Sequence, residues 1–266
     1  VAESTGEYVA VQGAGDISLP DRLSAQVAAL NADPWLVGVT CRHENRHIGG
    51  RSDGQRVTPN DGFTRVSHKL LMERLGSPLN HGALMYRRKI YDQVGGYRPF
   101  FHFAQDFDLT LRLTELGDFE FLVDTLYVRN VFSVDGVASR VDRSLMQLKY
   151  CEIAKSFSQQ KRIWGMDPID IFGPSAWLSV QGNYQLAKAE AKVALNYLRF
   201  GQMPDAIFMA RLAWHEKKTF LTFSVRAMLE LCRLPLIHLA LAKVIRLIPI
   251  KSHRNFTRLV SKVGKN

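Results

Sequence analysis

The stretch Phe103-Ala-Gln-Asp106-Phe-Asp108-Leu-Thr-Leu-Arg-Leu113 places two acids at the start of a regularly apolar segment. Its apolar positions fit a strand period of two and also helical spacing, so periodicity alone leaves the element open. The flanks favour a helix: Asp106 is a good N-cap, Asp108 and Arg112 are four residues apart, and Gly117 follows as a stop. A carboxylate there is stabilised by the helix dipole and can face a substrate. Asp106 is therefore either the centre of the chemistry or simply an N-cap.

The composition is that of a globular protein, with 266 residues, 46% hydrophobic and 23% charged. Cys41, Cys151 and Cys232 are odd in number and widely spaced. This pattern argues against a disulfide framework and favours a reducing, cytoplasmic location. The chain does not begin with Met, and its first residues run directly into a strand pattern. We expect that an N-terminal piece is missing.

The formal charge of +10 is concentrated at the end of the chain, where residues 232–266 hold eight Lys and Arg residues and no Asp or Glu. On a helix these cations would line one side of an apolar surface, which is typical of segments that lie on an anionic membrane. The alternative is a terminal helix packed on the domain with a solvated basic face. The run from Leu234 to Ile250 is interrupted by charges and prolines, so it is not a comfortable membrane span. No nucleic-acid-binding motif accompanies the charge, and we expect no nucleic acid partner.

The first half of the chain alternates strand and helix patterns. Strands are predicted at Tyr8 to Gln12 and Leu36 to Cys41, with a helix from Pro20 to Leu30 between them, capped by Ser18. The buried face of that helix is predicted to be Leu23, Val27 and Leu30. A strand–helix–strand unit favours an α/β layer. The remaining predicted elements are a loop or ragged β excursion over Arg42 to Thr64, helices at Val66 to Leu75 and Arg88 to Val94, and strands at Ala83 to Arg87 and Phe119 to Val128.

From residue 144 the pattern becomes helical, with Gly201-Gln-Met-Pro204 joining two helices as a hairpin. Small residues would let these helices approach closely: Ala187, Ala191, Ala194, Ala206, Ala210 and Ala213. The predicted helices are Ser144 to Phe157, Tyr184 to Phe200, Pro204 to Glu216 and Thr222 to Ile237. The sequence therefore predicts two domains: residues 1–143, which are α/β, and residues 144–266, a helical region with a basic amphipathic tail.

The segment His43-Glu44-Asn-Arg-His47 fits the zinc-protease pattern of two histidines four residues apart with a glutamate between them. That chemistry requires a helix, which puts both imidazoles on one side. Here the segment follows a predicted strand and runs into Gly49-Gly50. We expect no metalloprotease site.

Several motifs in residues 1 to 130 together resemble the second half of family 2 inverting glycosyltransferases. The motifs are Gly6-Glu-Tyr-Val-Ala, Gly13-Ala-Gly-Asp16-Ile-Ser-Leu-Pro-Asp-Arg-Leu23, His81-Gly-Ala-Leu-Met-Tyr-Arg-Arg88, Val94-Gly-Gly-Tyr97 and Gln105-Asp-Phe-Asp-Leu-Thr-Leu-Arg-Leu113. The resemblance implies a partial GT-A-like mixed sheet with flanking helices that lacks the N-terminal half, which grips the nucleotide in that family.

The resemblance also implies a donor-diphosphate site at Gly13, Gly15 and Asp16. The family usually carries an Asp-Ala-Asp-Asp run here that holds a divalent cation, Mg²⁺ or Mn²⁺. In this chain Gly13 and Gly15 replace the first two acids of the run, and Asp16 remains. Asp16 is then either a metal or diphosphate ligand, with the glycines admitting backbone amides, or a residue that stabilises the turn.

Asp106 matches the catalytic base of the family, in a motif normally written Glu-Asp and here Gln105-Asp106. Such a base removes the proton of an acceptor hydroxyl as the oxygen attacks the anomeric carbon. Six further residues are predicted to bind substrate: His81, Gly95, Gly96, Tyr97, Gln105 and Asp108. His81 is also well explained as a structural histidine, and the two glycines as a helix end.

The resemblance implies transfer of a sugar from a nucleotide-sugar donor to a glycan or lipid-linked acceptor, at the cytoplasmic side of a membrane. The alternative, from a different class, is a non-catalytic remnant that acts as a membrane-associated or partner-binding module.

Overall fold

The computed structural model describes residues 1, 3–49, 53–54, 56–57, 62–132, 141–199 and 202–232. The chain divides into two compact units. Unit 1 comprises residues 1–136 and 153–179, and unit 2 comprises residues 137–152 and 180–266. The predicted domain boundary at residue 143 stays a prediction.

Unit 1 is built on a mixed sheet that has seven strands among the described residues. The order is β1-β6-β3-β7-β2, with β4 paired to β3 and β5 paired to β7. Only β3 and β7 pair in parallel; the other described pairings are antiparallel. The strands are β1 (Tyr8–Ala10), β2 (Ile17–Ser18), β3 (Leu36–Ile48), β4 (Arg56–Val57), β5 (Arg65–Val66), β6 (Met85–Arg87) and β7 (Asp118–Phe132).

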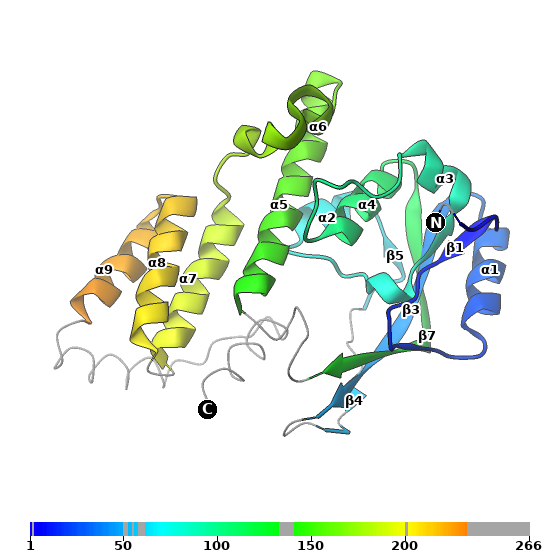
Figure 1. The fold of residues 1–266 in the computed structure, drawn as a ribbon, viewed down its shortest axis with the longest axis horizontal. Coiled ribbons are helices and arrows are strands. Elements are labelled where there is room, and N and C mark those ends of the chain that lie inside the picture. Colours follow the sequence, from blue (N-terminus) through cyan, green and yellow to red (C-terminus); the bar gives the residue numbers. More distant parts are fainter. Residues whose placement is uncertain are drawn as a thin grey trace. The chain divides into compact units, whose positions relative to one another are not determined.

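The two long strands β3 and β7 run side by side from Leu36↔Asp118 to Ile48↔Phe132 (Figure 1). The predicted strand at residues 36–41 therefore continues through residues 42–48. Of the two alternatives for this segment, a loop or a β excursion, the β excursion is correct here. Parallel pairing with β7 satisfies the backbone there, so a polar sequence can remain a strand. Register shifts near Arg42 interrupt the ladder.

Helices cover both faces of the sheet, which confirms the mixed α/β class. In Figure 1, α1 (Arg22–Ala32) lies on one side of the sheet, and α2 (His68–Glu73) and α4 (Gln105–Thr114) lie on the other. The 3-10 helix η2 (His81–Ala83) precedes β6, and α3 (Arg88–Gln93) follows it.

The predicted buried face of α1 is right for Leu30 and for Val27, which packs against the same core cluster, but wrong for Leu23. Leu23 is 50% exposed, whereas Arg22 and Gln26 are at most 1% exposed, together with Leu30. The two polar side chains are buried because they bond backbone oxygens: Arg22 donates to Val11 O, and Gln26 donates to Ala83 O at 2.8 Å. Ser18 is not the cap either, because it belongs to β2; the N-cap position is Asp21.

The second segment of unit 1 consists of residues 153–164 of α5 (Val141–Trp164), then α6 (Pro168–Phe172) and η4 (Gly173–Ser179). Several polar contacts fix it to the first segment, among them three made by residues of α5. Ser158 bonds His68 Nε2 at 3.3 Å, Lys155 donates to Arg74 O at 2.7 Å, and Lys161 pairs with Glu115 at 3.2 Å.

Unit 2 contains α7 (Tyr184–Arg199), α8 (Met203–Glu216) and α9 (Phe220–Leu231). The predicted small-residue contact is confirmed: the six alanines named in the prediction, three on α7 and three on α8, are at most 1% exposed. Thr219 and Thr222 form a capping box, so α9 begins two residues earlier than predicted. Within the described residues no helix is both long and apolar enough to cross a membrane. The basic tail lies outside the described residues from position 233 onward.

Candidate functional site

Asp106 stands in the first turn of α4, but it is not the N-cap. That position is held by Ala104, which adopts the left-handed conformation with φ of 53° and is fully buried. The prediction failed because this turn closes on the backbone, with Asp108 N donating to Ala104 O at 2.9 Å, rather than on a side chain. Asp106 is left partly exposed, and no described side chain donates a hydrogen bond to its carboxylate. A left-handed alanine costs about 1–2 kcal/mol, which is a strain of the kind concentrated at functional turns.

His81 and Tyr97 meet within range of the charge of Asp106. His81 Nε2 lies 2.8 Å from the Tyr97 hydroxyl, which also contacts the Tyr86 hydroxyl at 3.5 Å. Burial raises the pKa of Tyr97 above its usual range, and the neighbouring tyrosines and the negative charge of Asp106 raise it further. Tyr97 therefore keeps its proton at neutral pH and can act as a hydrogen-bond donor here.

The Gly95-Gly96 turn ends α3 and leads into Tyr97. Both glycines have positive φ, 77° and 65°, and a Cβ on Gly96 would lie 2.7 Å from the Tyr91 hydroxyl. Only glycine satisfies both requirements at Gly96. The turn therefore has a packing reason that is independent of substrate.

Asp108 lies on the inner side of α4, 1% exposed, between two arginines. Arg98 donates to both of its oxygens, and Arg112 donates to Oδ2 at 2.8 Å. Arg112 also donates to Val94 O and Gly96 O, and so holds the glycine turn against α4. This arrangement favours a positioning role for Asp108. Gln105, the first residue of α4, is exposed.

Asp16 contrasts with Asp106, because both of its carboxylate oxygens are engaged. The Tyr127 hydroxyl donates to Oδ2 at 2.7 Å, and Asn130 N donates to Oδ1 at 2.9 Å. A Cβ on Gly13 would lie 2.3 Å from Asp16 Oδ2, and Gly15 has φ of 79°. Gly13 is therefore needed for the packing of this turn, whereas position 15 requires a residue that tolerates positive φ.

Tyr127 was not predicted as a site residue, although it joins the two predicted clusters. Its buried hydroxyl accepts from Gly13 N at 2.9 Å, and a Cβ on Gly82 would lie 2.1 Å from it. Gly82 follows His81 directly. The contacts thus run from Tyr97 and His81 to Gly82, Tyr127 and Asp16, and the charge of Asp106 acts on Tyr97. The sequence signal for Tyr127 was the pair Gly13 and Gly82, which have no side chain and so leave room for the tyrosine ring.

Arg22 was missed as well. Its guanidinium lies 4.9 Å from the centre of the Tyr127 ring and donates to Gln12, Gln26 and two backbone oxygens. Burial lowers its pKa. Within the described residues Arg22 has no carboxylate within ion-pair distance, so it contributes uncompensated positive charge behind the Asp16 turn.

His43 and His47 both lie on β3, not on a helix. Four residues along a strand separate two side chains by about 13 Å, too far to share one zinc ion. His43 is buried near Asp16 and Arg129. Burial and the charge of Arg129 lower the pKa of His43 to about 4, and Asp16 opposes this shift.

The residues around Asp16 do not fit a divalent cation held by the protein. Mg²⁺ and Mn²⁺ prefer several oxygen ligands, usually including one or two carboxylates. Here Gly13 and Gly15 offer no side chain, and both Asp16 oxygens already accept hydrogen bonds. In the part of the chain that is described, no group of three His, Cys, Asp or Glu residues is arranged to hold a metal.

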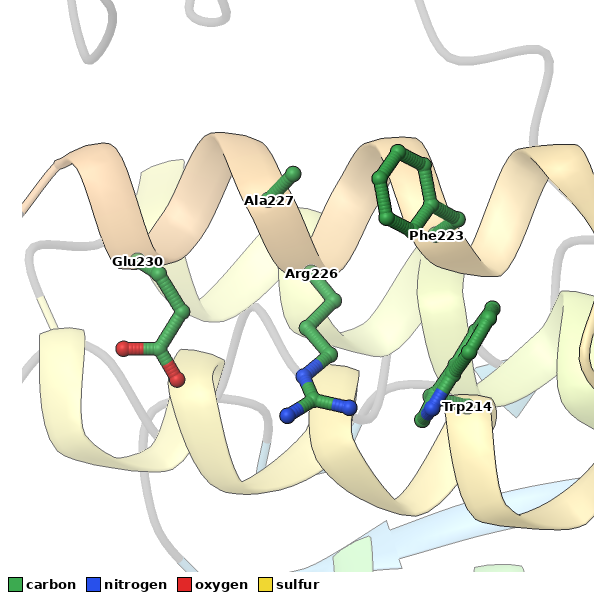
Figure 2. A pocket seen from close by; sticks show the side chains of 5 residues that line it. All are labelled: Trp214, Phe223, Arg226, Ala227 and Glu230. Carbon is green, nitrogen blue, oxygen red and sulfur yellow. The ribbon is translucent and has the colours of Figure 1, made fainter.

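A separate open pocket of about 320 Å³ lies between α8 and α9 in unit 2 (Figure 2). Its lining residues are Trp214, Phe223, Arg226, Ala227 and Glu230. Arg226 lies over the Trp214 ring, and Glu230 pairs with Arg211 at 2.6 Å. None of the predicted site residues lines this pocket.

Comparison with known proteins gives one partial likeness. The chain is 30% identical over 128 residues to a protein of Bacillus subtilis (strain 168) named "Putative glycosyltransferase EpsE". The match covers 44% of this chain, and the chain spans 40% of the length of that relative. No family model matches the chain. The likeness supports glycosyl transfer in general terms.

Proposed function

We propose that unit 1 is the acceptor-side part of an inverting glycosyltransferase that uses a nucleotide-sugar donor, with Asp106 as the general base. The observation that carries the proposal is the state of Asp106. Its carboxylate is partly exposed in the first turn of α4, without a hydrogen-bond donor among the described side chains, and its charge acts on Tyr97 of the His81–Tyr97 pair. The resemblance in sequence and the likeness to a relative named as a glycosyltransferase support the same chemistry.

In this mechanism the acceptor hydroxyl binds against Asp106, which takes its proton as the oxygen attacks the anomeric carbon. Direct displacement inverts that centre and releases the nucleoside diphosphate. Tyr97, which keeps its proton, orients the acceptor through its hydroxyl, and His81 holds that hydroxyl in place. Asp108 does not touch substrate; it fixes α4 and the Gly95-Gly96 turn through its two arginines.

The departing diphosphate needs its developing negative charge stabilised. The Gly13 amide is taken by Tyr127, so in the Gly13-Ala-Gly15 turn the amides of residues 14 and 15 would approach a phosphate, and Arg22 supplies positive charge behind the turn. We infer that these groups take the part that a bound cation has in the family that the sequence resembles.

The test is Asp106→Asn in the longest natural form of the protein. Release of nucleoside diphosphate from a panel of nucleotide sugars is measured with and without polyprenyl-phosphate-linked glycan acceptors. The variant should lose about 10²–10⁴-fold in turnover, because asparagine cannot accept the proton. Calorimetric binding of UDP and GDP should be unchanged.

Asp92→Asn is the matched control, because Asp92 is an exposed carboxylate on α3 outside the contact chain. It should retain wild-type turnover. Equal turnover by Asp106→Asn and the wild type would remove Asp106 from the mechanism.

One observation favours the second candidate, a non-catalytic remnant that binds a partner or a membrane. It is the engagement of both Asp16 oxygens, which leaves the turn without a free carboxylate. The remnant predicts no nucleotide binding and no diphosphate release by the longest natural form, whereas the enzyme predicts both.

A further inference from the structure

Glu190 is a buried acid in the middle of α7. It is 2% exposed, and the residues one turn before and after it, Ala187 and Ala194, are fully buried. Its Oε2 atom is buried and has no hydrogen-bond partner among the described residues. An ionised carboxylate without a partner is strongly disfavoured in such surroundings, so this position needs a physical explanation.

The neighbouring acid, Glu216 at the end of α8, is engaged at both oxygens. Its Oε2 pairs with Lys149 Nζ at 3.1 Å, and its Oε1 accepts from Asn183 N at 3.0 Å. Asn183 Nδ2 also donates to Glu152 Oε2 at 2.6 Å. These contacts join residues 149 and 152 of α5, the residue before α7 and the end of α8 in one polar network within unit 2.

The charges that face Glu190 from α5 and α8 do not balance. Glu216 repels an ionised Glu190, and Lys149 attracts it. Lys149 is already paired with Glu216, and Glu152 adds a third carboxyl to the same network. Within the described part of unit 2, one lysine therefore serves several acids, and Glu190 has no ion pair of its own.

Charged groups on α7 and α9 do not supply the missing cation. Lys188 and Lys192 are two residues before and after Glu190, a spacing that places them on other sides of the helix. On α9, Arg226 and Glu230 line the open pocket between α8 and α9. Proton binding is then the simplest way for Glu190 to stay buried.

We propose that Glu190 is a proton-operated switch in unit 2: its neutral form belongs to the packed arrangement of α5, α7 and α8, and its ionisation loosens that packing. A neutral carboxyl carries no charge to bury and is not repelled by Glu216. Burial and the charge of Glu216 raise the pKa of Glu190 to about 7, and Lys149 opposes this shift. The change of charge therefore falls near neutral pH.

The direction of the pH dependence follows from the raised pKa. The ordinary pKa of this glutamate is 4.5, so between pH 4.5 and pH 7 folded unit 2 binds a proton that the unfolded chain does not. The stability of unit 2 should fall as the pH rises through this window, by about 10²-fold in the folding equilibrium constant from pH 5 to pH 8. His43 of unit 1, whose pKa is lowered, gives the opposite dependence, so the two units are followed separately.

A fluorescence reporter confined to unit 2 tests the proposal. Of the four tryptophans, only Trp214 lies in unit 2, so the full chain with Trp35→Phe/Trp164→Phe/Trp177→Phe reports the unfolding of that unit in urea. In this background unit 2 should lose about 10²-fold in the folding equilibrium constant from pH 5 to pH 8. Glu190→Gln cannot ionise and should abolish this loss. The matched control Asp205→Asn removes an exposed acid of α8 and should retain it.

A direct titration provides a second readout that does not depend on the stability of a variant. With carbon-13 in the glutamate carboxyl groups, nuclear magnetic resonance of the wild type should show one carboxyl that titrates near pH 7. Glu190→Met should remove that signal. A wild type in which no glutamate titrates above about pH 6 would overturn the proposal, and so would equal pH dependence of unit 2 in Glu190→Gln and its parent.

Discussion

Asp16 and Asp106 have similar partial exposure but opposite surroundings. Asp16 accepts hydrogen bonds on both oxygens, from Tyr127 and from the backbone of Asn130, and its turn is shaped around it. Asp106 has no such donor among the described residues, and its neighbour Asp108 takes the arginines. A carboxylate without a fixed partner can accept a proton from a substrate, whereas a fully engaged one mainly holds a fold. The comparison therefore supports the proposal that Asp106 is the reactive acid and Asp16 a structural one.

The sharpest test of this difference uses the two acids of α4. Asp108→Asn should lower the free energy of unfolding by about 3–5 kcal/mol, because Arg98 and Arg112 would keep buried charge without their shared carboxylate. Asp106→Asn should change it by less than about 0.5 kcal/mol. Urea unfolding followed by circular dichroism measures both. Equal losses would mean that Asp106 has a structural partner and would weaken its assignment as a base.

The pH dependence of stability tests the surroundings of Asp16, because the buried His43 lies near it. The pKa of His43 is lowered to about 4 from an ordinary 6.5. Between these values the unfolded chain binds a proton that the folded protein does not, so stability falls as the pH falls. The loss from pH 7 to pH 4 should reach about 3 kcal/mol. Thermal unfolding of the wild type should show it, and His43→Gln should reduce it.

His102→Gln is the control for that series, because His102 is exposed. This variant should follow the wild-type pH dependence. A wild type whose stability is constant down to pH 4.5 would show that His43 is protonated in the folded protein.

The smallest expected effect concerns divalent cations. Diphosphate release by the wild type should change by less than about twofold between excess EDTA and millimolar Mn²⁺, because Asp16 is the sole carboxylate of its turn and is already engaged. Gly15→Asp sharpens the comparison, since a Cβ there meets nothing within 4 Å and aspartate tolerates positive φ. This variant should gain a response to Mn²⁺. A tenfold loss of wild-type activity in EDTA would contradict the assignment of Asp16 as structural.

Much of the fold could be predicted because local signals agreed with tertiary packing. The strand–helix–strand start, the helix after Arg87 and the alanine contacts of α7 and α8 are cases of this kind. Position 22 was not predictable in the same way. An arginine on a helix normally faces water, and burial of Arg22 depends on backbone oxygens of residues 11 and 84, which only the folded sheet brings together.

The residues of the candidate site also differ in whether a local sequence pattern or only tertiary packing determines their position. Asp106 stands out in sequence because an acid at a helix start has a recognisable pattern. The left-handed Ala104 has none, since its conformation follows from packing around a fully buried residue. Tyr127 lies more than 100 residues from the turn it stabilises, and no local pattern connects such distant positions.

The contacts of Ser158, Lys155 and Lys161 bear on how this protein could be divided or recombined. These three residues contact α2, its C-cap Arg74 and the end of α4. They belong to residues 153–179 of unit 1, which follow residues 137–152 of unit 2 along the chain. A fragment that stops after β7 would expose His68 and leave Glu115 without its lysine. Chimeras with relatives should therefore exchange residues 153–179 together with the sheet, although the two segments are separate in the sequence.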